Sequence, residues 1–247
     1  MSIENNKKLS INGWIYLDKP LGMTSNKLLQ KVRRLFQNCK AGYVGTLDPM
    51  ASGFLPVALG KATKTIKYIE RSSKEYIFTV NWGVKTNTGD LEGEILANNA
   101  MIPSGSDINR CIKLFLGKIK QKPSKFSAIK VNGERAYKLA RKGLEFDLKK
   151  RNIEIYDFKL IKYLSNSQSQ FYVNSSSGTY IRTLIEDFAS SMGVLGHLSS
   201  LRRIGFGKLD KKLISLDSLI SLMHIDKLIR LLKPIDAIFE GVKRIDL

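Results

Sequence analysis

The sequence has few of the residues on which many enzyme chemistries depend. Its 247 residues include two cysteines, Cys39 and Cys111, and two histidines, His197 and His224. Two cysteines allow at most one bridge, so the chain has neither a disulfide framework nor a CxxC metal pattern. Two isolated histidines exclude a multi-histidine metal site. His197 is either a base or, as we favour, a satisfied structural histidine.

Several sequence motifs are also missing. The chain has no GxSxG nucleophile elbow, no GxxxxGK[ST] phosphate loop and no GxGxxG dinucleotide loop. No apolar run approaches the length of a membrane span, and residues 1–10 are polar and carry lysine instead of an apolar signal core. We therefore expect a soluble, cytoplasmic protein whose chemistry depends on a carboxylate, a tyrosine or an arginine.

Negative charge is scarce relative to positive charge. Lysine and arginine total 41 against 22 acidic residues, which gives a formal net charge of +19. Such an excess favours a polyanionic partner, because basic side chains release counterions from phosphates. The competing interpretation is a merely solvated lysine surface encoded by an AT-rich genome. The hydrophobic share of 43% is ordinary for a globular protein, so a packed core is expected.

The N-terminal part predicts a short buried strand at 14–17, a turn at 18–22 and a helix capped by Thr24 or Ser25. One face of this helix is apolar and includes Leu28, Leu29, Val32, Leu35 and Phe36. The opposite face carries Lys27, Lys31 and Arg34. These cations are equally compatible with a solvated face and with a face that contacts RNA.

The remainder alternates between strand and helix patterns without a regular βαβ rhythm. Residues 41–60 read as a loop because glycine is frequent there, and 86–93 and 132–133 read as turns. We expect strands at 74–84, 94–97, 126–131, 153–164 and 170–175, and helices at 108–115, 134–142 and 180–192. This order predicts an α+β fold rather than a doubly wound nucleotide-binding fold.

The stretch from 41 to 60 is the strongest candidate for a catalytic segment. Its glycines and two prolines, Pro49 and Pro56, predict a compact and irregular path. Pro49 biases Asp48 away from helical conformations, so the Asp48 carboxylate can be presented on a rigid turn. The alternative is an ordinary Asp-Pro turn in which the carboxylate bonds its own backbone.

Residues 42–64, Gly-Tyr-Val-Gly-Thr-Leu-Asp-Pro-Met-Ala-Ser-Gly-Phe-Leu-Pro-Val-Ala-Leu-Gly-Lys-Ala-Thr-Lys, resemble the catalytic signature of the TruB family of tRNA pseudouridine synthases. Four more segments resemble motifs of the same family in the same order: 12–25, 123–141, 177–184 and 201–203. Together the five motifs extend over nearly the whole chain.

The resemblance implies a pseudouridine synthase fold, with a central mixed and mainly antiparallel sheet, flanked by helices and loops, and an RNA-binding cleft. It implies one catalytic domain over 1–247, in which 118–143 grips RNA. The implied activity is isomerisation of uridine 55 in the T loop of tRNA to pseudouridine after base flipping. No metal, cofactor, guide RNA or obligatory protein partner is expected, and we expect a monomer.

The resemblance also assigns roles to individual residues. Asp48 matches the catalytic aspartate, and Arg182 matches the arginine that pairs with it. Tyr76 matches an active-site tyrosine that packs on the target base and is a candidate base, while Tyr180 and Leu201 match other pocket positions. Without the resemblance, Tyr76 and Leu201 would be read as core residues. The residues expected to bind RNA are Lys19, Tyr43, Lys64, Lys130, Arg202 and Arg203.

Two departures from the family pattern concern Tyr43 and the end of the chain. The family commonly has histidine at the position of Tyr43, and a tyrosine ring can still stack on exposed bases. The chain ends at Leu247, just after 232–237, where the family usually continues into a small RNA-binding PUA module, so we expect that module to be absent. The alternatives are a non-catalytic tRNA-binding chaperone and a guide-RNA-directed synthase.

Overall fold

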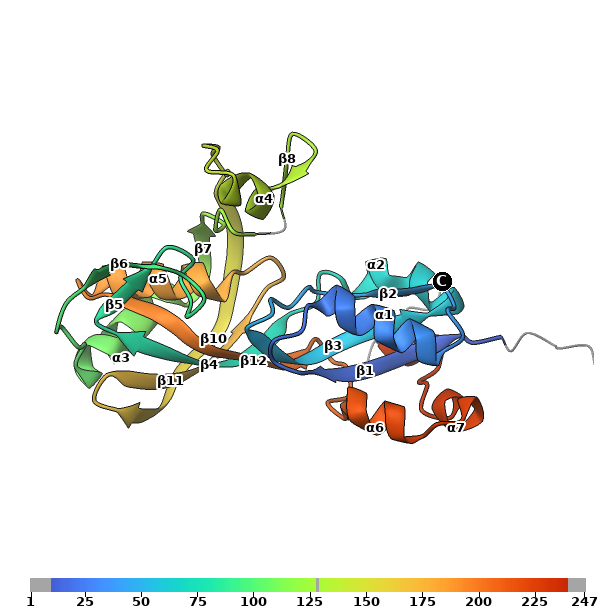
Figure 1. Ribbon diagram of the computed structural model, residues 1–247. Coiled ribbons are helices and arrows are strands. Elements are labelled where there is room, and N and C mark those ends of the chain that lie inside the picture. Colours follow the sequence, from blue (N-terminus) through green and yellow to red (C-terminus); the bar gives the residue numbers. More distant parts are fainter. Residues whose placement is uncertain (1–9, 128, 240–247) are drawn as a thin grey trace, which may run out of the picture. The chain divides into compact units, whose positions relative to one another are not determined.

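The computed structural model describes residues 10–127 and 129–239, which divide into two compact units (Figure 1). The first unit comprises 10–72 and 204–239, and the second comprises 73–203. The expectations for the first nine residues, for Ala128 and for the chain end at Leu247 lie outside the described residues. The single domain expected over 1–247 stays a prediction.

In the first unit, β1 pairs in parallel with β13 and antiparallel with β3, and β2 also pairs with β3. The strands are β1 (Gly13–Lys19), β2 (Ala41–Tyr43), β3 (Ala51–Leu59) and β13 (Ile214–Ser215). The helices are α1 (Ser25–Leu35), α2 (Ile66–Ile69), α6 (Leu216–Ser221) and α7 (Ile225–Ile229), with 3-10 turns η1 (Gly60–Thr65) and η2 (Ile235–Phe239).

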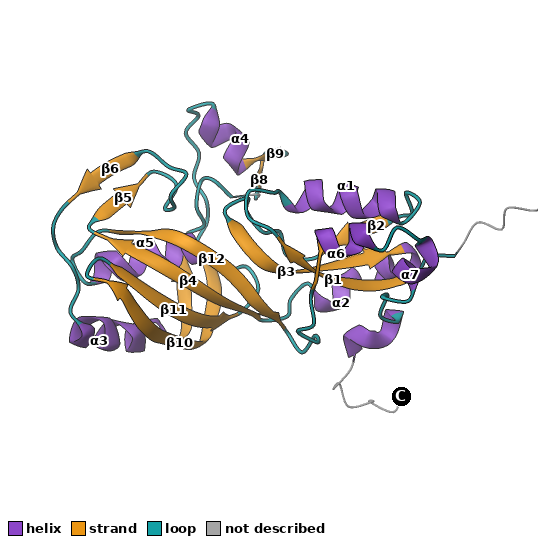
Figure 2. Cartoon of the chain, turned by 60° about the horizontal axis from the view of Figure 1, so that its bottom comes forward, coloured by secondary structure: helices purple, strands orange, loops and turns teal. Residues whose placement is uncertain are grey.

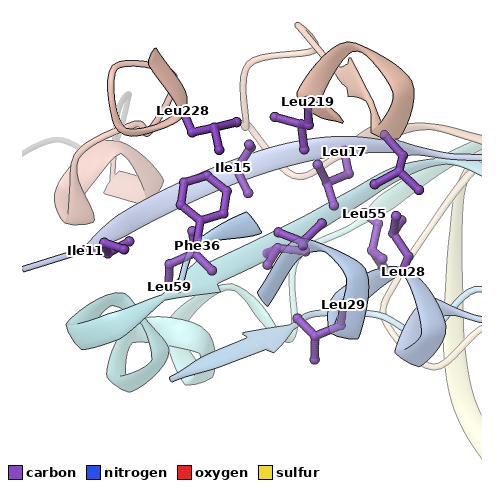
Figure 3. Close-up of a cluster of buried hydrophobic side chains, with 13 residues drawn as sticks. Ile11, Ile15, Leu17, Leu28, Leu29, Phe36, Leu55, Leu59, Leu219 and Leu228 are labelled. Carbon is purple, nitrogen blue, oxygen red and sulfur yellow. The ribbon is translucent and has the colours of Figure 1, made fainter. Parts of the chain in front are cut away.

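Helices α1, α6 and α7 bury their apolar side chains against β1 and β3 (Figure 3). Helix α1 contributes Leu28 and Leu29 together with Phe36 just beyond its end, as its sequence pattern predicts. The Thr24 side chain accepts a hydrogen bond from the Lys27 backbone N–H, which confirms Thr24 as the helix cap. Burial of this apolar face fixes α1 on the sheet of its own unit.

The second unit has the strand order β12-β4-β11-β10-β7, and the pairs of β11 with β4 and β10 and of β10 with β7 are antiparallel (Figure 2). Its strands are β4 (Lys74–Trp82), β5 (Val84–Thr86), β6 (Ile95–Asn98), β7 (Gly117–Gln121), β8 (Lys130–Val131), β9 (Glu134–Arg135), β10 (Arg151–Ser165), β11 (Gln168–Ser175) and β12 (Gly196–Phe206). Its helices are α3 (Gly105–Phe115), α4 (Ala136–Arg141) and α5 (Ile181–Ser191). The last three residues of β12 belong to the first unit.

Aromatic side chains form the core of the second unit. The rings of Phe78 and Phe171 stack with centroids 5.6 Å apart, and Phe188 on α5 lies edge-on to Phe171 at 5.8 Å. Phe158 on β10 lies 5.0 Å from Phe188. These contacts attach α5 to the sheet of its unit, and so give its first turn a rigid support.

Strands β8 and β9 and helix α4 stand away from the sheet of the second unit (Figures 1 and 2). Asn132 and Gly133 join β8 to β9 with positive φ angles of 50° and 87°, as a tight hairpin turn requires. The turn predicted at 132–133 is therefore confirmed, and it lies in the segment 118–143 that was expected to grip RNA.

The α+β class and the mixed, mainly antiparallel sheet are confirmed. The loop predicted over 41–60 is wrong, because β2 and β3 occupy most of that range and leave only 44–50 irregular. Strand β3 is buried at every position except Ser52. A strand buried on both faces has no alternation of polar and apolar residues, and Gly53 and Pro56 made it look like a loop.

The strand predicted at 126–131 is also largely wrong, because among its described residues only Lys130–Val131 is assigned to a paired strand. Ser127 N–H instead donates to the Ser124 carbonyl in a turn, and the Phe126 carbonyl accepts a hydrogen bond from Arg182. The hydrogen bond from Arg182 therefore occupies the Phe126 carbonyl, which a strand would need for pairing with its neighbour. Strand β12 was not predicted.

Candidate active site

Asp48 lies in the loop 44–50 between β2 and β3 of the first unit, and its side chain is partly exposed. The Ala51 N–H donates to the Asp48 carbonyl at 3.1 Å, and the Gly22 N–H donates to the Pro49 carbonyl at 2.8 Å. Gly45 takes a φ of +69°, a conformation that glycine adopts without strain. Backbone bonds on both sides of Asp48 thus define the path of the loop.

Ser25, the first residue of α1, supports the same loop from beneath. Its hydroxyl donates to the Leu47 carbonyl and accepts from the Leu47 N–H, both at 2.9 Å, and Ser25 is buried. Because Thr24 supplies the helix cap, the Ser25 hydroxyl is left for Leu47, the neighbour of Asp48. From the sequence, Ser25 was considered only as an alternative helix cap. Its bond to Leu47 could not be predicted, because Leu47 is 22 positions away.

In the second unit, Arg182 is held in the first turn of α5 by backbone and charged groups. Its Nη1 lies 3.2 Å from the Thr88 carbonyl oxygen and 3.4 Å from Asp90 Oδ2, and its Nη2 donates to the Phe126 carbonyl at 3.3 Å. The Arg182 and Asp90 side chains are 9% and 4% exposed. A buried ion pair of this kind needs further hydrogen bonds to offset its desolvation.

Asp90 has those further bonds. Its Oδ1 accepts from the Thr88 hydroxyl at 2.6 Å and from the Glu92 N–H at 3.0 Å. The sequence missed Asp90, because a polar segment such as 86–93 indicates a turn and does not reveal which carboxylate faces an arginine. The signal that was present is an acidic residue inside a glycine-containing turn.

Glu186 lies one helical turn after Arg182 and packs under the turn that carries Asp90. A Cβ at Gly89 would lie 2.8 Å from Glu186 Oε1, and Gly89 has a φ of +74°, so that position favours glycine. Burial raises the pKa of Glu186, the charges of Asp187 and Asp90 raise it further, and Lys85 and Arg182 oppose the shift. Protonation of Glu186 is thus coupled to the surroundings of the Arg182–Asp90 pair.

Tyr76 on β4 and Arg203 on the neighbouring strand β12 are both buried and joined by a side-chain hydrogen bond. Burial lowers the pKa of the Arg203 guanidinium, while the bond to Tyr76 opposes that shift. Leu201 is also buried and alternates with the exposed Arg202 along β12. Tyr76, Leu201 and Arg203 therefore have core-like burial within the second unit.

Tyr180 precedes α5 and is partly exposed. Its N–H donates to Gln121 Oε1 at 2.9 Å, and its carbonyl accepts from Gln121 Nε2 at 3.1 Å. Gln121, at the end of β7, thereby fixes the backbone that enters α5. The sequence did not single out Gln121.

The expected RNA-binding residues differ in exposure. Lys64, Lys130 and Arg202 are exposed and Tyr43 is partly buried. Lys19 is fully buried, and its Nζ donates to the carbonyls of Pro20 and Met23 at 2.9 and 2.6 Å. The RNA contacts predicted for Lys19 and Arg203 stay predictions, and in the structure both cations bind protein atoms.

The predicted site residues are divided between the two units. The first holds Lys19, Tyr43, Asp48 and Lys64, and the second holds Tyr76, Lys130, Tyr180, Arg182, Leu201, Arg202 and Arg203. His197 is buried in the second unit with Nδ1 3.0 Å from the Val84 carbonyl oxygen, as expected of a structural histidine. Within 10–127 and 129–239, no group of three or more His, Cys, Asp or Glu side chains could hold a metal ion. No helix in that part of the chain is long and apolar enough to cross a bilayer.

The chain matches two family models in succession. Residues 33–181 match the TruB family pseudouridylate synthase N-terminal domain, and residues 182–240 match the tRNA pseudouridylate synthase B C-terminal domain. The tRNA pseudouridine synthase B of Caulobacter vibrioides is 38% identical over 94% of this chain and 76% of its own length. The tRNA pseudouridine synthase B of Ehrlichia ruminantium is 39% identical over 95% of this chain and 80% of its own length.

Solved structures agree with this assignment. A chain in the crystal structure of a Cbf5-Nop10-Gar1 complex is 28% identical with a TM-score of 0.73, covering 94% of this chain and 63% of that one. A chain in an H/ACA RNP bound to a substrate RNA containing 2'-deoxyuridine is 27% identical with a TM-score of 0.68, covering 92% and 61%. This chain thus spans about three fifths of the length of those solved chains. Because a family model matches more than half of the chain, and close relatives cover most of it, the chain belongs to the TruB family of pseudouridylate synthases.

Proposed function

We propose that this chain isomerises a uridine of tRNA to pseudouridine, that the uridine is number 55 in the T loop, and that Asp48 is the catalytic carboxylate. The observation that carries the proposal is the family match, which runs from 33 to 240 and includes the whole Asp48 loop. The relatives are named tRNA pseudouridine synthase B. The reaction is an isomerisation with no net oxidation or reduction, so it requires no redox cofactor.

The reaction breaks the bond between N1 of uracil and C1′ of the ribose, turns the free base and joins C5 to C1′. The proton on C5 is then lost and N1 gains one, so atoms and charge balance. Cleavage leaves positive character at C1′, as in glycoside hydrolysis. An ionised Asp48 carboxylate supplies the opposite charge or a nucleophile at that moment.

Following the family resemblance, Arg182 is proposed as the cation that pairs with the catalytic carboxylate. In the second unit its guanidinium group is held by hydrogen bonds to the carbonyls of Thr88 and Phe126 and by an ion pair with Asp90. A guanidinium group that is already held in one conformation loses little conformational entropy when it pairs with a carboxylate. The ion pair with that carboxylate is therefore more favourable. Asp90 therefore acts as a positioning residue for Arg182.

The detached uracil must stay bound while it turns. An aromatic ring and an apolar wall suit that task, and we assign them to Tyr76 and Leu201, with Tyr180 as a further contact. Arg203 donates to the Tyr76 hydroxyl and so holds the ring in one orientation. A uridine stacked in a folded loop is unreachable, so the nucleotide must also be flipped out.

Basic residues of the segment 118–143 are proposed to grip the T arm. Strands β8 and β9 and helix α4, within this segment, stand away from the sheet of the second unit (Figure 1). Lys130 is exposed on β8, whereas Lys122 is paired with Asp147 at 2.6 Å. Lys130 is thus better placed than Lys122 to meet a phosphate.

The experiment that tests this proposal is the Asp48→Asn variant, assayed as the purified chain alone on an unmodified tRNA transcript. Asparagine keeps the size and the turn-forming bonds of aspartate but has neither its charge nor a nucleophilic oxygen. We expect tRNA binding to persist and pseudouridine at position 55 to fall below detection, as measured by chemical mapping. Asp226→Asn, which removes an exposed carboxylate on α7, is the matched control and should keep full activity.

Substantial pseudouridine formation by Asp48→Asn would return Asp48 to the role of a turn residue. A wild-type chain that is active only after a guide RNA is added would favour the guide-directed alternative. A wild-type chain that binds tRNA and leaves every uridine unchanged would favour the chaperone alternative.

A further inference from the structure

Helix α1 carries an unusual distribution of charge. Its residues include Lys27, Lys31, Arg33 and Arg34 and no aspartate or glutamate. Lys27 and Lys31 are four positions apart, and Arg34 follows three positions later, so the three lie on one face and repel one another. Lys27 is also in the first turn, where the helix dipole disfavours a cation. The repulsion among the three cations and the position of Lys27 lower helix stability, although the helix dipole favours Arg34 in the last turn.

The packing of α1 leaves that face free. Leu28 and Leu29 are buried against the sheet of the first unit (Figure 3), and Val32 is buried with them. Lys27, Lys31 and Arg34 are exposed. Arg33 differs from them, because its guanidinium donates to the Cys39 carbonyl and to Gln30 Oε1. Lys27, Lys31 and Arg34 are called the α1 cationic face below.

Several exposed cations elsewhere in the protein are paired with acids. Arg110 pairs with Asp107, Lys142 with Glu134 and Lys159 with Asp157. In the described part of the chain, the side chains of the three residues of the α1 cationic face take part in no ion pair and no hydrogen bond. A run of cations without internal counter-charges attracts an external polyanion.

The position of α1 connects this face with the candidate catalytic loop. Ser25 at the start of the helix forms hydrogen bonds with both the N–H and the carbonyl of Leu47. Lys27 follows two residues later in the same helix. From Lys27 to Arg34 the helix rises about 10 Å, a length over which one nucleic-acid strand carries about three phosphates. The three cations thus match the phosphate spacing of a strand that approaches the Asp48 loop.

We propose that the α1 cationic face binds the phosphate backbone of the substrate RNA next to the nucleotide that is modified. The choice of RNA as the polyanion rests on the proposed function. This contact is separate from the segment 118–143, which belongs to the second unit. It carries no base specificity, because lysine and arginine contact phosphates as charges.

The test is a triple variant, Lys27→Gln, Lys31→Gln and Arg34→Gln, in the full chain. Binding of an unmodified tRNA transcript is measured by fluorescence anisotropy over a range of salt concentrations. Loss of three phosphate contacts should reduce the slope of log affinity against log salt by about 2 to 3. The thermal midpoint should stay equal or rise, because repulsion within α1 is removed.

The matched control removes three exposed cations that lie on three different elements, α3, β10 and α7: Lys113→Gln, Lys162→Gln and Lys227→Gln. It lowers the net charge by the same amount, and we expect its salt slope and its activity to stay close to those of the wild type. A second variant, Lys27→Arg, Lys31→Arg and Arg34→Lys, keeps the charges and should keep the wild-type slope.

An α1 variant whose slope equals that of the control would overturn the inference. So would a variant that binds tRNA normally but loses binding to anionic lipid vesicles, since the face would then serve a membrane surface. A wild-type chain that binds tRNA through α1 yet forms no pseudouridine would support the inference and contradict the proposed function, so the two failures are distinguishable.

Discussion

In the first unit the loop of Asp48 is held by neutral hydrogen bonds, whereas in the second unit Arg182 is held by a buried charge. Ser25 bonds both polar groups of Leu47, and Asp48 itself stays partly exposed. Arg182 is almost completely buried and depends on Asp90 and two carbonyl groups. In the proposed function, Asp48 meets the substrate and so must remain accessible, while Arg182 supports it and can be locked in place.

The two kinds of support differ in cost when one partner is removed. A neutral hydrogen bond contributes little net stability, yet a buried donor left unsatisfied is costly. Removing one side of a buried ion pair leaves an uncompensated charge and costs more. We therefore expect mutations around Arg182 to act on folding and mutations around Asp48 to act mainly on the reaction.

The largest effect is expected for Asp90→Ala in the second unit. This change removes the Asp90 carboxylate that pairs with the Arg182 guanidinium, and it leaves the Thr88 hydroxyl and the Glu92 N–H without that acceptor. The free energy of unfolding should fall by about 3–5 kcal/mol. Urea unfolding measures this loss, and pseudouridine formation should be abolished. Glu92→Ala, which removes an exposed carboxylate in the same turn, is the control; an equal loss in both variants would contradict the importance of the pair.

A smaller effect is expected for Ser25→Ala in the first unit. The Leu47 N–H and carbonyl lose their buried partner, so the free energy of unfolding should fall by about 1–3 kcal/mol. Because Leu47 precedes Asp48, kcat for pseudouridine formation should fall more than stability alone explains at a temperature where the variant is folded. Ser218→Ala, an exposed serine on α6, is the control. Unchanged kcat in Ser25→Ala would show that the Asp48 loop keeps its geometry without this bond.

The smallest effect is expected for Glu186→Gln, and it concerns pH. Burial raises the pKa of Glu186 above its ordinary value of 4.5, so the folded state retains a proton that the unfolded state has already released. Stability from this group is present below pH 4.5 and is lost as the pH rises through the folded pKa. The stability difference between wild type and Glu186→Gln should therefore shift in favour of the variant over that window. Thermal melts across pH measure it, with the exposed Glu92→Gln as the control; parallel curves would contradict the raised pKa.

Much of the architecture was predictable because it depends on local patterns. The apolar stripe of α1, the alternating β4 and the helix α5 were each confirmed from periodicity in the sequence. Strand β3 was missed because burial on both faces removes the alternation on which the prediction depends. The strand expected near 126 was wrong because Arg182 uses the carbonyl of Phe126.

Residues of the candidate site could be predicted only where the neighbouring sequence marks them. Asp48 was predicted as the catalytic carboxylate because proline and glycine surround it and because the five motifs resemble one family, and that role stays a prediction. Asp90, Ser25 and Gln121 were missed, since each acts on a partner that is distant in sequence. The roles assigned to Tyr76, Tyr180 and Leu201 stay predictions, because their burial is equally that of core residues.

The sequence by itself determined the charge, the family and the position of the carboxylate, because these depend on residue types and their order. It also determined which side of α1 is apolar and which is cationic. Only the tertiary structure decided that Asp90 neutralises Arg182, that Ser25 braces Leu47 and that the cations of α1 have no acidic partner in the described part of the chain. The physical reason is that desolvation, ion pairing and hydrogen bonding depend on distances between segments, and the order of residues does not encode those distances directly.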